Sequence, residues 1–102
     1  MWSTLSKYRT VARMVYPQYI EFEEWVKSGS SRTSFLLDTH LIQVSRHYVG
    51  FEVKVNNDYL IPMIPNGTKE IKAIYVFWQA ERYAKGNESV FAPRRSEPGV
   101  VE

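Results

Sequence analysis

The chain of 102 residues has no cysteine and little glycine. Without thiols it cannot form disulfides, thiolate zinc sites or a cysteine nucleophile, which fits a reducing compartment or a hot environment. The five glycines form no phosphate-binding loop, so no cofactor is expected. No apolar run reaches the roughly 20 residues of a membrane span, and the first residues lack the apolar stretch of a signal peptide. We therefore expect a soluble, intracellular protein.

An excess of charge of one sign is also lacking, because 13 basic and 11 acidic side chains give a net charge of +2. Acids and bases alternate along the whole chain, which is typical of an ordinary solvated surface. A domain that binds duplex nucleic acid usually carries a basic stripe on one element, and no such stripe is visible here.

What the chain has in abundance is aromatic residues: three Trp, seven Tyr and five Phe. The length predicts one domain, which we expect to span residues 1–91, with residues 92–102 as a flexible C-terminal tail rich in Pro and Gly. A core this small can hold most of these rings but not all of them. Tyr and Trp left over at the surface would favour an interface with a partner.

The residue pattern predicts an α+β fold, with a mostly antiparallel sheet of three to five strands packed against two principal helices. One helix is expected to run from Gln18 to Lys27 after Pro17, with three glutamates on a solvated face, Glu21, Glu23 and Glu24. The other begins after a Thr68 cap and stops at Gly86.

Three strand-forming runs lie between these helices. In the middle run, Phe51, Val53 and Val55 alternate with Glu52 and Lys54, which indicates one buried and one solvated face. The pair Asn56–Asn57 favours a hairpin turn, and Pro62 marks the returning strand as a sheet edge. The expected runs are Ser34–Ser45, Tyr48–Asn56 and Tyr59–Ile64.

The segment from Tyr8 to Tyr16 fits either a helix or a strand, and its β-branched and aromatic residues favour the strand slightly. Residues 19–28 also resemble residues 77–86. Two chance amphipathic helices are the simpler explanation. The sharper hypothesis is two degenerate strand–helix repeats with a cleft between them.

The run from Ile71 to Trp78 gives the main functional hypothesis. As a helix it has one apolar stripe, yet Val76 and Phe77 point elsewhere, and a surface helix of a small domain needs a single stripe. We therefore predict that a partner covers the side with Val76 and Phe77. This partner would be a protein or peptide, or a second copy of the chain in a homodimer. The aromatic anchors for this non-catalytic binding would be Phe22, Trp25, Phe77 and Trp78.

The alternative function is binding of single-stranded nucleic acid, or of nucleic acid without sequence preference. Basic residues cluster near aromatic side chains at the N-terminus and recur in the tail, a combination that such binding uses. The residues that would contact the phosphates are Lys7, Arg9, Arg13, Arg94 and Arg95.

Enzyme chemistry has little support in the sequence. Asp38 and His40 would share one face of a strand, but no strained nucleophile motif accompanies them. The same two residues, with His47 and Glu52, match no metal-ligand spacing. We expect neither catalysis nor a metal site.

Size, aromatic richness and the absence of cysteine together resemble the short orphan proteins encoded by filamentous viruses of hot-living archaea. This resemblance covers the whole chain without a motif. It implies an intracellular protein of the infected host cell, and it implies no functional residues.

Overall fold

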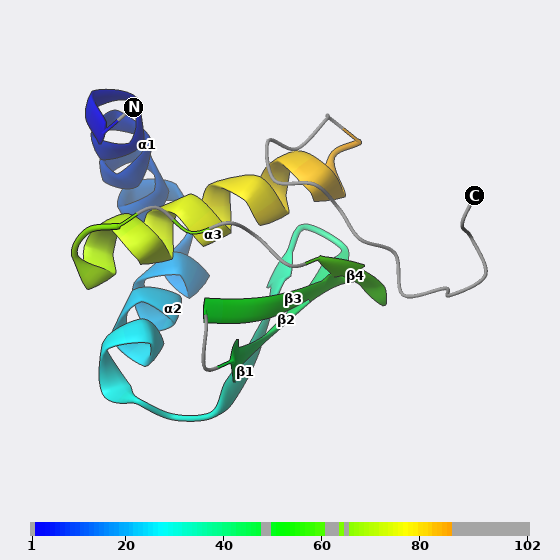
Figure 1. Ribbon diagram of the computed structural model, residues 1–102. Coiled ribbons are helices and arrows are strands. Elements are labelled where there is room, and N and C mark those ends of the chain that lie inside the picture. Colours follow the sequence, from blue (N-terminus) through cyan, green and yellow to red (C-terminus); the bar gives the residue numbers. More distant parts are fainter. Residues whose placement is uncertain (1, 48–49, 61–63, 65, 87–102) are drawn as a thin grey trace, which may run out of the picture.

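The computed structural model describes residues 2–47, 50–60, 64 and 66–86, without the side chains of residues 2, 3 and 60. Three helices and four strands follow one another in the order ααββββα (Figure 1). The elements are α1 (Trp2–Val15), α2 (Pro17–Ser28), β1 (Arg32–Leu37), β2 (His40–His47), β3 (Gly50–Val55), β4 (Asp58–Leu60) and α3 (Lys69–Ala84).

The strands form one antiparallel sheet in the order β1-β2-β3-β4. Helices α2 and α3 pack on one side of this sheet, and α1 packs on α2 and α3. The α+β class and the antiparallel sheet predicted from the sequence are confirmed, but the described residues form three helices where two principal ones were expected. Among them no helix is long and apolar enough to cross a membrane.

The extra helix is α1, and the expectation of a strand over residues 8–16 is wrong. Leu5 and Ala12 are buried while Val11 and Val15 are exposed, so the apolar positions that pack follow a helical period. The β-branched residues that suggested a strand lie on the solvent side of this helix. Tertiary contact of one face therefore outweighs the local β propensity.

Because α1 precedes α2, the proposed strand–helix repeat lacks its first strand. Residues 19–28 and 77–86 both lie on helices or at their ends, and α2 and α3 pack on each other. Their likeness is that of two amphipathic helices, as the simpler explanation held. Pro62 and the tail over residues 92–102 lie outside the described residues, so nothing follows for the edge or the tail predicted there.

The run Ser34–Ser45 is not one strand, because the chain turns at Asp38 and separates β1 from β2. Asp38 has φ of +56°, and Asn56 and Asn57 have φ of +51° and +76° at the next turn. Asp and Asn tolerate this left-handed region better than other residues with a side chain. The hairpin predicted at Asn56–Asn57 is confirmed, and the turn at Asp38 uses the same chemistry.

The ends of α2 and α3 agree with the sequence signals. Pro17 opens α2, and Gly29 follows it in the left-handed conformation, as predicted for a helix stop. Thr68 caps α3, its side chain accepting a hydrogen bond from the backbone N–H of Ile71. Arg46 of β2 donates to the backbone oxygens of Trp25 and Val26, which ties the last turn of α2 to the sheet.

The core lies between the helices and the side of the sheet that faces them, which we call the inner face. Phe77 is 0% exposed and Val76 is 1% exposed, so the expectation that a partner must cover them is wrong. The ring of Phe77 lies 4.9 Å from that of Tyr19 and 5.4 Å from those of Tyr16 and Phe35. Helix α3 can bury two sides because α1 and α2 cover what the sheet leaves open.

Candidate functional site on the open face of the sheet

The four predicted partner anchors do not form a binding surface. Phe22 and Phe77 are buried in the core and Trp25 is 8% exposed, under the guanidinium of Arg46. Trp78 is half-buried and packs against the core, with Tyr75 edge-on at 6.2 Å. The rings of Phe22 and Phe77 lie against Phe35 of β1, and the ring of Trp25 lies against Phe51 of β3, so these three hold helices to the sheet.

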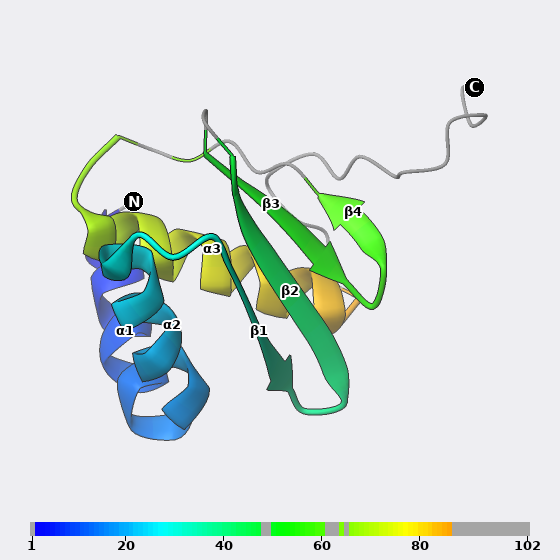
Figure 2. The same cartoon turned by 90° about the horizontal axis from the view of Figure 1, so that it is seen from below.

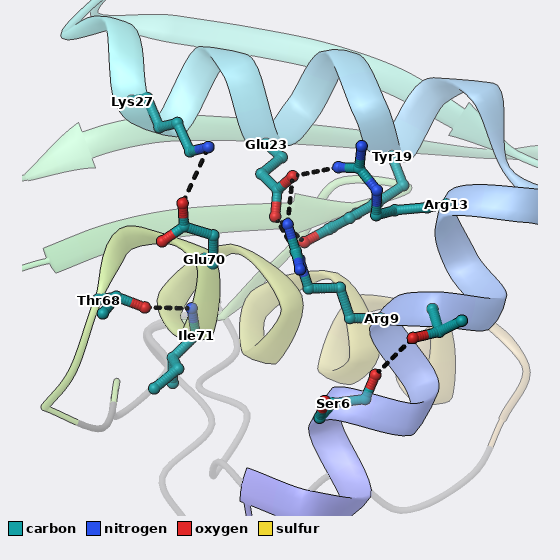
Figure 3. Close-up of polar contacts among 10 residues, drawn as sticks. Ser6, Arg9, Arg13, Tyr19, Glu23, Lys27, Thr68, Glu70 and Ile71 are labelled. Carbon is teal, nitrogen blue, oxygen red and sulfur yellow. Dashed lines mark hydrogen bonds and ion pairs between the residues drawn. The ribbon is translucent and has the colours of Figure 1, made fainter.

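The predicted nucleic-acid residues are also divided by the structure. Lys7 is exposed on α1, whereas Arg9 and Arg13 both bind the carboxylate of Glu23, at 2.7 and 2.6 Å. Figure 3 shows the two guanidiniums reaching from α1 to Glu23 on α2. Arg94 and Arg95 lie outside the described residues.

The sequence predicted that Glu23 lies on a solvated face. This prediction is wrong, because Glu23 is only 1% exposed. The hydroxyl of Tyr19 donates to it at 3.0 Å. Burial alone would raise the pKa of Glu23, but the hydrogen bonds from Arg9 and Tyr19 and the charge of Arg13 lower this pKa below its ordinary value. This cluster joins α1 to α2 and explains the arginines without a ligand.

A second carboxylate, Glu81 of α3, joins α1 to α3. It accepts hydrogen bonds from the hydroxyls of Tyr8 and Tyr16, and it forms an ion pair with Lys85. Burial raises its pKa, but these partners more than compensate and lower it. Burial and the carboxylate raise the pKa of Tyr8 well above its ordinary range. Both carboxylate clusters are fully occupied by neighbours, which is typical of structural networks.

The pairing of Asp38 with His40 on one strand face is wrong, because Asp38 belongs to the turn that precedes β2. The His40 ring meets the side chain of Asn56 at 2.8 Å instead. His47 lies 3.8 Å from Glu52 at the other end of the sheet. Within the described residues, no three His, Asp or Glu side chains are grouped as metal ligands would be.

The side of the sheet away from the helices, which we call the outer face, carries a different set of residues. Figure 2 looks onto this face, with the strands in front and α3 behind them. The pairing register aligns two rows of side chains across the strands. They are Arg32, Ser45 and Glu52 in one row, and Ser34, Gln43, Lys54 and Tyr59 in the next.

A hollow of about 470 Å³ lies over these rows, which is within the size range of ligand sites in proteins. Two of the residues that line it, Ser34 and Ser45, have short side chains. Apart from Val44, the residues of its lining are polar: Arg32, Thr33, Ser34, Gln43, Val44, Ser45, Glu52, Lys54 and Tyr59. Hydroxyls, an amide and charged groups therefore meet on a face that no described helix covers.

The charges around the hollow are unequally satisfied. Glu52 has the Tyr59 hydroxyl as a hydrogen-bond donor, which raises the pKa of Tyr59, and His47 is 3.8 Å away. In the described part of the chain, Arg32 and Lys54 have no ion-pair partner. The open face therefore offers two cations that no described acidic side chain neutralises in an ion pair.

Strand β1 borders the hollow and is an outermost strand of the sheet, with β2 as its one neighbouring strand among the described residues. The N–H of Arg46 donates to the oxygen of Ser31 at 2.9 Å, so alternate residues from Ser31 onward bond to β2. The backbone groups of Arg32 and Ser34 must then point away from the sheet. The oxygen of Leu36, also directed outward, accepts a hydrogen bond from the Gln18 side chain at 2.7 Å.

The sequence contains a signal for this face, and the signal does not come from the predicted aromatic anchors. The alternation of Glu52 and Lys54 with apolar neighbours predicts a solvated face, and the structure confirms it. Which residues of the other strands join that face depends on register. The register follows from the turn at Asp38, which was not predicted.

Comparisons of the chain with protein-family models, with curated protein sequences and with solved structures found no match.

Proposed function

We propose that this protein is a non-catalytic binding protein that takes up an extended segment of a protein or peptide partner along β1. The observation that carries this proposal is the edge of β1, which no described strand covers and whose backbone groups at Arg32 and Ser34 point outward. Such groups pair readily with an incoming strand, a common mode of peptide recognition. The edge lies beside the hollow, so side chains of the added strand would meet it.

The opposite edge of the sheet is a poorer candidate. Strand β4 has three residues against six in β1, so it offers fewer outward backbone groups within the described chain. The groups around the hollow are hydroxyls, an amide and charged side chains, which suit recognition. The alternative of nucleic-acid binding loses the support of Arg9 and Arg13, whose guanidiniums are bound to Glu23.

The experiment is selection from a displayed library of random peptides of about ten residues, long enough for one strand. The targets are the wild-type protein, Ser34→Pro and Ser34→Ala. Proline removes the outward N–H of Ser34 without removing a bond to β2, and alanine keeps that N–H. We expect enriched peptides that bind the wild type and Ser34→Ala but not Ser34→Pro.

Far-UV circular dichroism and thermal melting would first establish that Ser34→Pro is folded. The proposal fails if no peptide is enriched on the wild type. It also fails if the enriched peptides bind folded Ser34→Pro as well as they bind Ser34→Ala, because the edge would then not be used.

A further inference from the structure

We infer that the segment taken up by β1 carries carboxylates on one side and apolar side chains on the other. This inference rests on the proposed function and names the chemistry of its partner. An added strand would place alternate side chains over the outer face, beside Arg32 and Ser34. The remaining side chains would lie on the helix side of the sheet, beside Phe35.

The outer-face side of the segment should be acidic because of the two cations there. Arg32 is exposed at the edge itself, next to the position of the added strand, and has no ion-pair partner within the described residues. Lys54 lies on β3, about 14 Å from that strand at the usual strand spacing. Arg32 can therefore contact a carboxylate directly, and Lys54 adds attraction across the hollow.

The helix-side half of the segment should be apolar because of Phe35. This ring is only partly buried, although it lies 5.4 Å from Phe77 and 5.3 Å from Phe22 in the core. An apolar side chain of an added strand would complete its burial. Cross-strand pairs of aromatic and β-branched residues are favourable neighbours.

Two other occupants fit the face less well. A second copy of the chain pairing through β1 would bring no carboxylate to Arg32, because β1 reads Arg-Thr-Ser-Phe-Leu-Leu. A nucleic-acid strand would place phosphates near Glu52, and the described lining of the hollow offers them two cations, Arg32 and Lys54. Affinity for nucleic acid depends on many such phosphate contacts.

The test measures binding of fluorescent peptides by anisotropy. One peptide alternates glutamate with valine, a second replaces each glutamate with glutamine, and a third replaces each with lysine. We expect the glutamate peptide to bind the wild type at least about tenfold more tightly than the glutamine peptide, and the lysine peptide not to bind. Added salt should weaken binding of the glutamate peptide.

Three single variants locate the effect. Arg32→Glu should weaken binding of the glutamate peptide at least about tenfold. Lys54→Glu should weaken it about two- to fivefold, because Lys54 is farther from the added strand. Lys7→Glu is the matched control, since Lys7 is exposed on α1 and should leave the affinity unchanged. Charge reversal at Arg32 should also improve binding of the lysine peptide.

The results separate this inference from the proposed function. If all three peptides bind equally and Ser34→Pro abolishes each, the edge is used but the acidic preference is wrong. If no peptide binds but single-stranded oligo-dT does, and Arg32→Glu prevents it, both proposals are overturned. If light scattering finds a dimer that Ser34→Pro dissociates and no peptide binds, the edge serves a second copy, which also overturns the acidic partner.

Discussion

The two faces of the sheet use the same strands for opposite purposes. On the inner face, Val44 and Val53 are fully buried under the helices. On the outer face, the intervening residues Gln43 and Lys54 are exposed and line the hollow. Because side chains alternate along a strand, each strand contributes to both faces. The difference implies that stability and the proposed recognition can be altered separately in this protein.

The same difference explains why aromatic richness is a poor guide to function here. The rings that were predicted to be partner anchors lie between the helices and against the inner face. The Phe77 ring, for example, lies near four other rings. The outer face contains a single described aromatic side chain, Tyr59, in the hollow. The recognition proposed for that face would depend on backbone groups and charge.

The largest expected effect comes from removing the Phe77 ring, which lies in the core between the helices and the inner face. Phe77→Ala should lower the free energy of unfolding by about 3–5 kcal/mol, because the ring is fully buried and leaves a cavity. Urea denaturation measures the change. If the alanine variant does not fold, Phe77→Leu should still lower the free energy by about 1 kcal/mol.

The control is an apolar side chain of similar size on the outer face. Leu41 is 40% exposed, so Leu41→Ala should change the free energy of unfolding by no more than about 0.5 kcal/mol. Similar losses for Phe77→Ala and Leu41→Ala would contradict the division between the two faces.

Much of the fold could be predicted from local signals. The caps at Thr68 and Gly29, the Asn56–Asn57 turn and the alternation along β3 each depend on residues close in sequence. The state of residues 8–16 could not, because α1 is held by distant partners. Tyr8 and Tyr16 bind Glu81, more than sixty positions away, and local propensity contains no trace of such contacts.

The candidate site was harder to predict than the fold. A free edge is a property of strand order, and the place of β1 at the margin of the sheet follows only once all four strands are paired. Arg32 and Lys54 carry no local mark that distinguishes them from Arg9, which is bound to Glu23. Whether a cation is already paired depends on the folded chain.

The next expected effect is a loss of stability in acid. The pKa values of Glu23 and Glu81 lie below their ordinary value of 4.5 in the folded protein. The unfolded chain therefore takes up protons first, so the stabilisation is present above that ordinary value and is lost as pH falls through the lowered values. The urea midpoint should fall steadily between about pH 5 and pH 2.

A variant identifies the groups responsible. Glu23→Gln should be less stable than the wild type at pH 7, and its midpoint should depend less on pH because one shifted carboxylate is gone. The half-exposed Glu70, whose pKa is lowered to about 2 beside Lys27, provides the comparison. Water screens that pair, so Glu70→Gln should cost less stability at pH 7. An acid transition unchanged in Glu23→Gln would count against this assignment.

The smallest expected effect comes from removing one tyrosine–carboxylate hydrogen bond, either in the helix layer or on the outer face. Tyr19 and Tyr59 both have a hydroxyl bonded to a carboxylate, Glu23 in the helix layer and Glu52 on the outer face. Tyr19→Phe should cost about 1.5–3 kcal/mol of unfolding free energy, because the lost hydrogen bond is buried and its acceptor is charged. Tyr59→Phe should cost less than about 0.5 kcal/mol, because water can replace the hydroxyl at a half-exposed site. Urea denaturation of both variants tests the pair, and equal costs would mean that the hollow is as protected from water as the core.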